Sequence, residues 1–236
     1  MKPQVIFFDM GETLVTGLPR PVRRILASRL HLGDKEMKHA GRLIMTHPST
    51  DPFALAAALA EALPGIERCR LRDAVEHLWM EQIDCVRALP GAGSLLGALK
   101  SDGFNLGIIS NTWHPFYLGF SRYCPEIREL IDYTVLSYRA GCKKPSQDIY
   151  REALRQAGVP AASCWMIGDT YELDVQPAQQ AGMRTVWVLR SPHREKPLLA
   201  RVLRGERPLP DWTTDGIDEI YSLFKNPESD QRCRSF

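Results

Sequence analysis

The sequence predicts an α/β fold in which a parallel, doubly wound sheet is interrupted by an inserted helical domain. Two observations carry this prediction. Short apolar runs typical of buried strands alternate with helical segments along most of the chain, which is the pattern of a parallel sheet. A long helix-rich stretch separates the first of these runs from the second, and one crossover between neighbouring strands does not need that length.

The strands are predicted from runs of β-branched, aromatic and other apolar residues, because a strand that is buried on both faces loses its polar alternation. These runs cover residues 4–8, 105–109, 133–137, 164–167 and 185–189. Helices are predicted between them over residues 93–100, 146–157 and 175–181. Gly158 and Gly182 directly follow the last two segments and are typical helix stops.

The inserted domain is predicted from one long connection. Roughly 95 residues separate the first strand from the second, whereas a parallel crossover needs about a dozen. We therefore expect residues 15–89 to form a helical cap domain and residues 1–14 and 90–236 to form the sheet domain. Helices are predicted within the insert over residues 21–30, 34–45, 51–63 and 71–89, where strong helix formers such as the run FALAAALAEAL occur.

The composition argues against several classes of protein. The 30 basic and 28 acidic residues give a net charge of +2, so there is no basic excess for a nucleic-acid partner. No apolar run approaches the roughly 18 residues of a membrane span, and the first residues lack a secretory signal. The six cysteines include no C-x-x-C pair. We expect a cytoplasmic protein with free thiols, no membrane partner, and a monomeric or homodimeric state.

Polar residues follow the predicted strands where these end. Asp9, Ser110 and Asp169 each come at or directly after a strand, and Asp174 follows Asp169 within one loop. The carboxyl ends of parallel strands meet at one edge of the sheet, so these side chains are expected to converge. Crowded carboxylates repel one another unless a cation lies between them, and Mg²⁺ is the hard ion that prefers such oxygen ligands.

The same edge offers the parts that phosphoryl transfer needs. An aspartate such as Asp9 is a competent covalent nucleophile toward phosphorus. Ser110 and Asn111, with the backbone N–H groups there, are candidates for holding phosphoryl oxygens, and Lys144 is a candidate for neutralising their charge. The sequence thus indicates a small phosphorylated substrate.

Four segments together resemble the motifs of the haloacid dehalogenase superfamily. FFDMGETL resembles its first motif, a strand followed by D-x-D-G-T, and IISN resembles its second, a strand that ends in Ser or Thr. KKPSQDIY and MIGDTYELD resemble its third and fourth motifs. Their order and spacing agree outside the insert, and the insert is similar to the helical type-1 cap. The resemblance implies a Rossmann-like core and a hydrolase, with phosphatase the expected activity.

The resemblance also implies roles for individual residues. Asp9 would attack phosphorus and form an aspartyl-phosphate, and Lys144, rather than Lys143, would be the motif lysine. Ser110 would donate a hydrogen bond to the transferring phosphoryl group. The Mg²⁺ ligands would be Asp9, the backbone carbonyl of Gly11, Asp169 and Asp174.

One position departs from the family pattern. The phosphatases of this family carry a second aspartate two residues after the nucleophile, where this chain has Gly11, and Glu12 stands where the family usually has glycine. General acid–base help is typically worth 10²–10⁴-fold in rate, so the loss needs an explanation. Glu12 could serve as the acid, or the substrate could have a good leaving group.

Two other functions remain open for the same reason. A phosphonatase also lacks the second aspartate, but it would need a cap lysine such as Lys35 or Lys38. A protein that binds phosphate and regulates without turnover would also tolerate Gly11. The intact fourth motif argues against a metal-free dehalogenase. Trp113, His114, His47 and the arginines at 20, 23 and 24 are further candidates for substrate contact, although most residues of these types are surface charge or packing.

Overall fold

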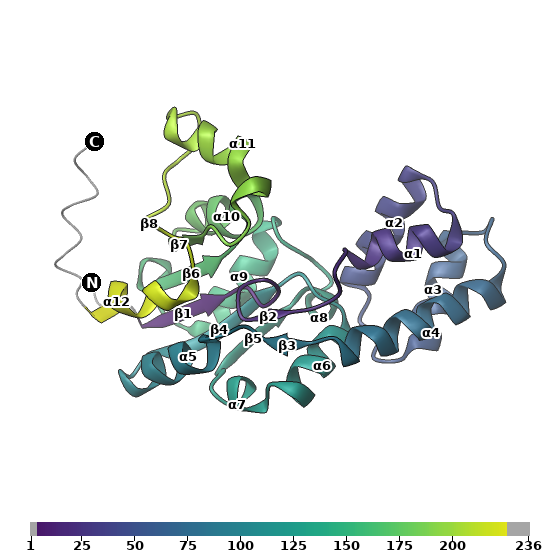
Figure 1. Cartoon of the computed structure of the whole chain (residues 1–236), viewed down its shortest axis with the longest axis horizontal. Helices are drawn as coiled ribbons and strands as arrows, with labels where there is room; N and C mark the ends of the chain where they lie inside the picture. Colours follow the sequence, from purple (N-terminus) through teal and green to yellow (C-terminus); the bar gives the residue numbers. More distant parts are fainter. Residues whose placement is uncertain (1–3, 226–236) are drawn as a thin grey trace.

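The computed structural model describes residues 4–225 and shows a six-stranded sheet flanked by helices, with a separate group of helices to one side (Figure 1). All pairings in the sheet are parallel, and the strand order is β5-β4-β1-β6-β7-β8. The strands are β1 (Val5–Phe8), β4 (Asn105–Ser110), β5 (Tyr133–Leu136), β6 (Cys164–Gly168), β7 (Arg184–Val188) and β8 (Trp212–Thr214). The predicted α/β fold with a parallel sheet is confirmed.

Helices cover both faces of this sheet, and an apolar cluster fills each interface. They are α5 (Ala92–Ser101), α6 (His114–Tyr123), α7 (Pro125–Arg128), α8 (Ser137–Ala140), α9 (Gln147–Ala157), α10 (Gln176–Gln180), α11 (Pro192–Leu203) and α12 (Ile220–Lys225). Ser146 caps α9, because its hydroxyl accepts a hydrogen bond from the Asp148 N–H. Gly158 ends the same helix in the left-handed conformation that its predicted role as a helix stop requires.

The helical insert consists of α1 (Val22–Leu30), α2 (Asp34–Thr46), α3 (Pro52–Ala62) and α4 (Arg68–Asp84). These helices pack around an apolar core of their own, which is distinct from the clusters on the sheet. Asp51 begins α3 by accepting a hydrogen bond from the Ala54 N–H at 3.0 Å, and Pro52 supplies the first helical residue. The insert stands beside the sheet as a second lobe (Figure 1).

The predicted helix over residues 71–89 extends too far. Helix α4 ends at Asp84, and Arg87–Ala88 forms a short strand, β3, that pairs antiparallel with β2 (Val15–Thr16). Val86 and Leu89 are buried in the core of the sheet domain rather than in the insert. The chain therefore leaves the sheet domain and returns to it through a two-stranded ribbon, which a helix through residue 89 would prevent.

Helix α4 of the insert packs directly against α6 of the sheet domain. A Cβ atom on Gly119 would lie 2.5 Å from the carbonyl oxygen of Ile83, so glycine is required for this close approach. Trp113, which precedes α6, is buried in the core of the insert, and its indole N–H donates to the Gln82 side chain at 3.0 Å. The insert is thus held on the sheet at the point where β4 ends.

Among the described residues, no helix is long and apolar enough to cross a membrane. The cysteines of this part of the chain are free, as expected, and Cys233 lies outside the described residues.

Candidate active site

The carboxyl ends of three adjacent strands bring the predicted polar residues together. β1 lies between β4 and β6, with Phe8 opposite both Ile108 and Ile167, so the next residues along these strands meet at one edge. Asp9, Asp169 and Asp174 each offer one carboxylate oxygen, and these three oxygens lie within 4.8 Å of one another. The structure therefore places the three acids at a single point.

A buried lysine joins two of these acids. The Nζ of Lys144 lies 2.7 Å from Oδ1 of Asp9 and 2.5 Å from Oδ1 of Asp174, and the side chain is only 2% exposed. Burial disfavours its charged form, but the carboxylates of Asp174 and Asp9 outweigh burial and raise the pKa of Lys144 to about 12. Lys144 is therefore a fixed positive charge directly beside Asp9.

Asn111 fixes the segment that carries this lysine. Its amide nitrogen donates to the backbone carbonyl of Lys144 at 2.9 Å, and its amide oxygen accepts from the Lys144 N–H at 2.7 Å. This reciprocal pair ties the end of β4 to the loop before α9, and the Lys144–Pro145 peptide within that loop is cis. Asn111 also lines the cleft, and its predicted role in phosphate binding stays a prediction.

Asp174 is held by the loop that follows β6. Its Oδ2 accepts a hydrogen bond from the Thr170 N–H at 2.9 Å, within a π-helical turn over Tyr171–Val175. A Cβ atom on Gly168 would lie 2.4 Å from Cγ of Asp174, so only glycine permits this placement. Burial raises the pKa of Asp174 to about 7, against the effect of the Lys144 ammonium and with support from the carboxylates of Asp9 and Asp169.

Asp169 is buried and pairs with a second cation, Arg194. Burial and the Asp9 carboxylate raise its pKa, whereas the Arg194 guanidinium, 2.5 Å from its Oδ2, opposes that shift. Arg194 also contacts the Thr170 hydroxyl at 3.1 Å and the Glu195 carboxylate at 3.2 Å. Arg194 was not predicted, because no sequence pattern marks this arginine and only the return of α11 to this edge brings it to the acids.

Glu12 has a backbone conformation that suits glycine. Its φ angle is 59°, in the left-handed region, and its N–H donates to the Val15 carbonyl at 2.8 Å. Its carboxylate pairs with Nε of Arg190 at 3.3 Å on the exposed rim of the site. Gly11 before it has room for a side chain, since a Cβ atom there would lie 3.4 Å from the Phe116 ring.

Replacing Glu12 by glycine should stabilise the fold. Relief of the left-handed strain is worth about 1 kcal/mol, and the exposed pair with Arg190 that is lost contributes little. We expect the free energy of unfolding, measured by urea denaturation, to rise for Glu12→Gly. Arg190→Gln removes the same ion pair without changing the backbone at residue 12, and it should leave the stability almost unchanged. A Glu12→Gly protein that is less stable than the parent would contradict this account.

A cleft of about 580 Å³ lies over the site, between the sheet domain and the start of the insert. Its polar lining includes Glu12, Arg20 and Arg194, while Met45, Trp113 and Phe116 are part of its apolar wall. His114 is bonded to the Tyr138 hydroxyl at 3.2 Å and is not part of this lining. The cleft thus borders the acidic cluster through Gly11, Asn111 and Arg194, and part of its wall is apolar.

The fold and the site together define a Rossmann-like α/β protein with an acid at the end of its central strand and a buried lysine beside it. A sequence model of the haloacid dehalogenase-like hydrolases matches residues 3–182. The chain belongs to the haloacid dehalogenase-like hydrolase family, which confirms the resemblance inferred from its motifs.

Curated relatives include phosphatases and a nucleotidase. The chain is 36% identical over 143 residues to pyrimidine 5'-nucleotidase YjjG of Escherichia coli, a match that covers 58% of this chain and 56% of the relative. It is 34% identical over 200 residues to glyceraldehyde 3-phosphate phosphatase of Methanothermobacter thermautotrophicus, which covers 78% of this chain and 85% of the relative. For the nucleotidase, the chain thus spans little more than half of the relative's length.

Solved structures share the fold over nearly the whole chain. A 2-haloacid dehalogenase from Pseudomonas syringae superimposes with a TM-score of 0.62 at 18% identity, over 95% of this chain and 99% of that one. A predicted phosphoglycolate phosphatase from Haemophilus somnus gives a TM-score of 0.62 at 16% identity, over 94% of this chain and 98% of that one. At these identities the likeness concerns the fold alone.

Proposed function

We propose that this protein is a Mg²⁺-dependent phosphatase that hydrolyses a small phosphorylated metabolite through an aspartyl-phosphate on Asp9. The observation that carries the proposal is the position of Lys144, whose ammonium bridges Asp9 and Asp174 while Asp169 completes the acidic cluster. The phosphatases and the nucleotidase among the relatives support the same reaction class.

The acidic cluster fits a divalent cation. Three carboxylates within 4.8 Å repel one another, and the two cations beside them, Lys144 and Arg194, are fewer than the acids. Hard oxygen ligands of this kind are those that Mg²⁺ prefers. We assign the ligands to Asp9, the backbone carbonyl of Gly11, Asp169 and Asp174. When bound, Mg²⁺ would lower the negative charge that the substrate phosphoryl group meets at this site.

The reaction divides into two displacements at phosphorus. A carboxylate oxygen of Asp9 forms a bond to phosphorus while the bond from phosphorus to the ester oxygen breaks, and the leaving oxygen takes up a proton. Water then attacks the same phosphorus, and the bond to Asp9 breaks, which releases inorganic phosphate, frees a proton and restores the carboxylate. Lys144 balances charge on the phosphoryl oxygens, and Ser110, buried at the end of β4, donates a hydrogen bond to them.

Glu12 is the candidate for the proton donor that the family usually places at the position of Gly11. Its side chain lines the cleft, but its carboxylate is paired with Arg190, and that contact must break before Glu12 can reach a leaving group. Turnover of simple alkyl phosphates is therefore expected to be slow.

Restoring the family aspartate should accelerate this step. Gly11→Asp places a carboxyl two residues after Asp9, where the Phe116 ring leaves room for its Cβ. We expect kcat on an alkyl phosphate to rise by about tenfold or more, because general acid catalysis is typically worth 10²–10⁴-fold. Gly11→Asn has the same size without the ionisable proton and serves as the control. A fall for Gly11→Asp on every substrate would identify Glu12 as the acid of the parent enzyme instead.

We further propose that residues 15–89 act as the cap over this site. The insert supplies Arg20 and Met45 to the cleft, opposite the polar residues of the sheet domain. A cap in this position excludes water and selects the leaving group.

The proposal is tested by a screen of phosphorylated metabolites with Mg²⁺, together with p-nitrophenyl phosphate and acetyl phosphate, and with Asp9→Asn protein as the blank. Phosphate release should require Mg²⁺, stop when a chelator is added and return when excess Mg²⁺ is restored. Turnover that ignores the chelator would contradict the proposal. Phosphate binding without turnover of any substrate would favour the regulatory alternative.

The phosphonatase alternative gains no support from the insert. Lys35 and Lys38 are exposed on α2, and neither lines the cleft over Asp9. Borohydride trapping with a phosphonate aldehyde should therefore leave both lysines unmodified.

A further inference from the structure

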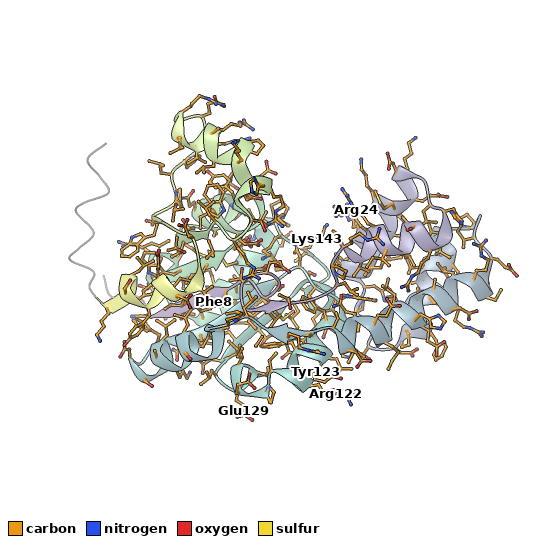
Figure 2. The ribbon with its side chains drawn as sticks, in the orientation of Figure 1. Phe8, Arg24, Arg122, Tyr123, Glu129 and Lys143 are labelled. Carbon is orange, nitrogen blue, oxygen red and sulfur yellow. The ribbon has the colours of Figure 1, made fainter. Side chains whose placement is uncertain are left out.

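Part of the cleft beside the acidic cluster is lined by apolar side chains from both lobes. Phe116 of α6, Met45 of α2 and Leu18 at the entry to the insert all line it, and each is only partly buried. In Figure 2, Lys143 marks the side of the sheet domain that faces the insert, and Arg24 marks helix α1 across from it. The volume of about 580 Å³ is in the range of small-molecule sites, so these side chains have surface left for a ligand.

Phe116 places an aromatic ring directly beside the loop that follows Asp9. A Cβ atom on Gly11 would lie 3.4 Å from Cε1 of this ring, and one on Gly17 would lie 3.0 Å from Cε2. The attacking and leaving oxygens are roughly in line at phosphorus, so the leaving oxygen lies on the far side of phosphorus from Asp9. The rest of the leaving group would extend into the cleft that Gly11 and the Phe116 ring border.

Several polar side chains of the lining are already engaged within the protein. Gln82 accepts a hydrogen bond from the Trp113 indole N–H at 3.0 Å, and the Thr112 hydroxyl donates to the Trp113 carbonyl at 3.3 Å. Asn111 uses both polar atoms of its amide on the backbone of Lys144. A leaving group rich in hydroxyls would therefore find few side-chain partners here, and hydroxyls that lose water without a partner cost free energy.

The charged side chains of the lining leave one cation for the ligand. Glu12 pairs with Arg190 at 3.3 Å, and Arg194 pairs with Asp169 at 2.5 Å. Arg20 has no ionic partner within residues 4–225. A guanidinium favours the face of an aromatic ring, and such a ring needs no hydrogen-bond partner.

The chemistry of the first loop favours the same kind of leaving group. Gly11 cannot donate a proton, and the carboxylate of Glu12 is held by Arg190. Without a general acid, the rate depends on how well the leaving oxygen carries negative charge. A phenol, with a pKa of about 10, leaves as its anion far more readily than an alkyl alcohol does.

We propose that the substrate is an aryl phosphate, the phosphate monoester of a phenol, whose ring lies in the cleft against Phe116. This inference rests on the proposed phosphatase activity and names its leaving group. An oxygen of Asp9 bonds to phosphorus while the bond from phosphorus to the phenol oxygen breaks, and the electron pair of that bond goes to the phenol oxygen. The phenolate then takes a proton from water.

The binding test uses phosphonates in which a methylene replaces the ester oxygen, so that binding is separate from turnover. Calorimetry with Mg²⁺ compares benzylphosphonate, which mimics phenyl phosphate, with 3,4-dihydroxybutylphosphonate, which mimics glycerol phosphate. We expect benzylphosphonate to bind about tenfold more tightly, because burial of its ring is favourable and the hydroxyls lose water without gaining partners.

Phe116→Leu and Met45→Gln should each lower this affinity ratio, the first by removing the aromatic face and the second by adding a polar group to the wall. The ratio cancels any general effect of a substitution on the phosphoryl site. Phe53→Leu and Leu118→Gln make the same changes at exposed positions outside the cleft lining, and they should leave the ratio unchanged.

The turnover test compares phenyl phosphate with benzyl phosphate, which carries the same ring on a far more basic leaving oxygen. We expect kcat/KM of the parent protein to be about a hundredfold higher for phenyl phosphate, since general acid help of typically 10²–10⁴-fold is missing. Gly11→Asp should narrow this gap, because the added acid helps the poorer leaving group more.

The inference would be overturned if benzylphosphonate bound no better than the dihydroxy ligand, if neither bound, or if the ratio survived both substitutions. Equal kcat/KM for phenyl and benzyl phosphate would also overturn it. The outcome is separate from that of the proposed function. Mg²⁺-dependent hydrolysis that favours glycerol phosphate over phenyl phosphate refutes the aryl substrate alone, whereas a preserved preference for the aromatic ligand without hydrolysis of any ester refutes the phosphatase alone.

Discussion

Replacing Asp9 by asparagine should abolish phosphatase activity while the protein stays folded. The substitution removes the nucleophile, and we expect kcat to fall by at least about a thousandfold, since no other carboxylate of the cluster occupies the end of β1. Asparagine has nearly the same shape, and the loss of one charge reduces repulsion among the three acids. The measurement is steady-state phosphate release with Mg²⁺, together with the thermal unfolding midpoint.

Asp132→Asn is the matched control for this variant. Asp132 also pairs with a lysine, Lys100, at 2.5 Å, but it accepts a hydrogen bond from the Leu106 N–H near the beginning of β4, whereas the site lies where β4 ends. Activity of Asp132→Asn should stay close to that of the parent protein. Residual turnover in Asp9→Asn that is comparable with the control would show that Asp9 is not the nucleophile.

Replacing Gly168 by alanine should disable the site through one methyl group. The added Cβ would lie 2.4 Å from Cγ of Asp174, so the carboxylate must leave its position beside Lys144 and Thr170. Overpacking of this kind typically costs about 1–3 kcal/mol of stability. We expect a loss of stability in this range, weaker Mg²⁺ binding by calorimetry, and a fall in kcat of about a hundredfold, as for other misplaced catalytic groups.

Gly97→Ala is the control for Gly168→Ala. It shows whether the loss of activity comes from the contact with Asp174 or from any replacement of glycine by alanine. Gly97 lies within α5, and a Cβ atom there would meet nothing within 4 Å. Alanine should therefore stabilise the helix by about 0.5–1 kcal/mol and leave activity unchanged. If Gly168→Ala behaved in the same way, the placement of Asp174 described above would be wrong.

The sheet was predictable because its central strands are continuous apolar runs that end in acids or serine. The elements that were missed lack such patterns. Helix α6 begins with His114 and Pro115 and is rich in aromatic residues, and α11 contains Pro197, which predicts a break rather than a helix. Strand β8 has only three residues at the edge of the sheet. The pairing of β2 with β3 joins two-residue strands that lie far apart in the sequence, and such contacts leave no local pattern.

The site was predictable in its acids and its lysine, because topology alone brings the ends of parallel strands together. The contacts that hold these acids and this lysine in place were not predictable. The double hydrogen bond from Asn111 to Lys144, and the ion pair of Arg194 with Asp169, each join residues that are remote in the sequence. At positions 11 and 12 this chain has glycine and then an acid, the reverse of the family order. The left-handed conformation of Glu12 shows that position 12 is one where the backbone favours glycine, yet this chain carries a side chain there.

The most direct test of the central claim is to locate the phosphoryl group during turnover. Protein mixed with acetyl phosphate and Mg²⁺, quenched in acid within milliseconds and mapped by mass spectrometry, should carry a phosphoryl group on Asp9. The same sample with a chelator should carry none. Turnover in the presence of Mg²⁺ with the phosphoryl group on another residue, or equal labelling with and without the chelator, would contradict the account.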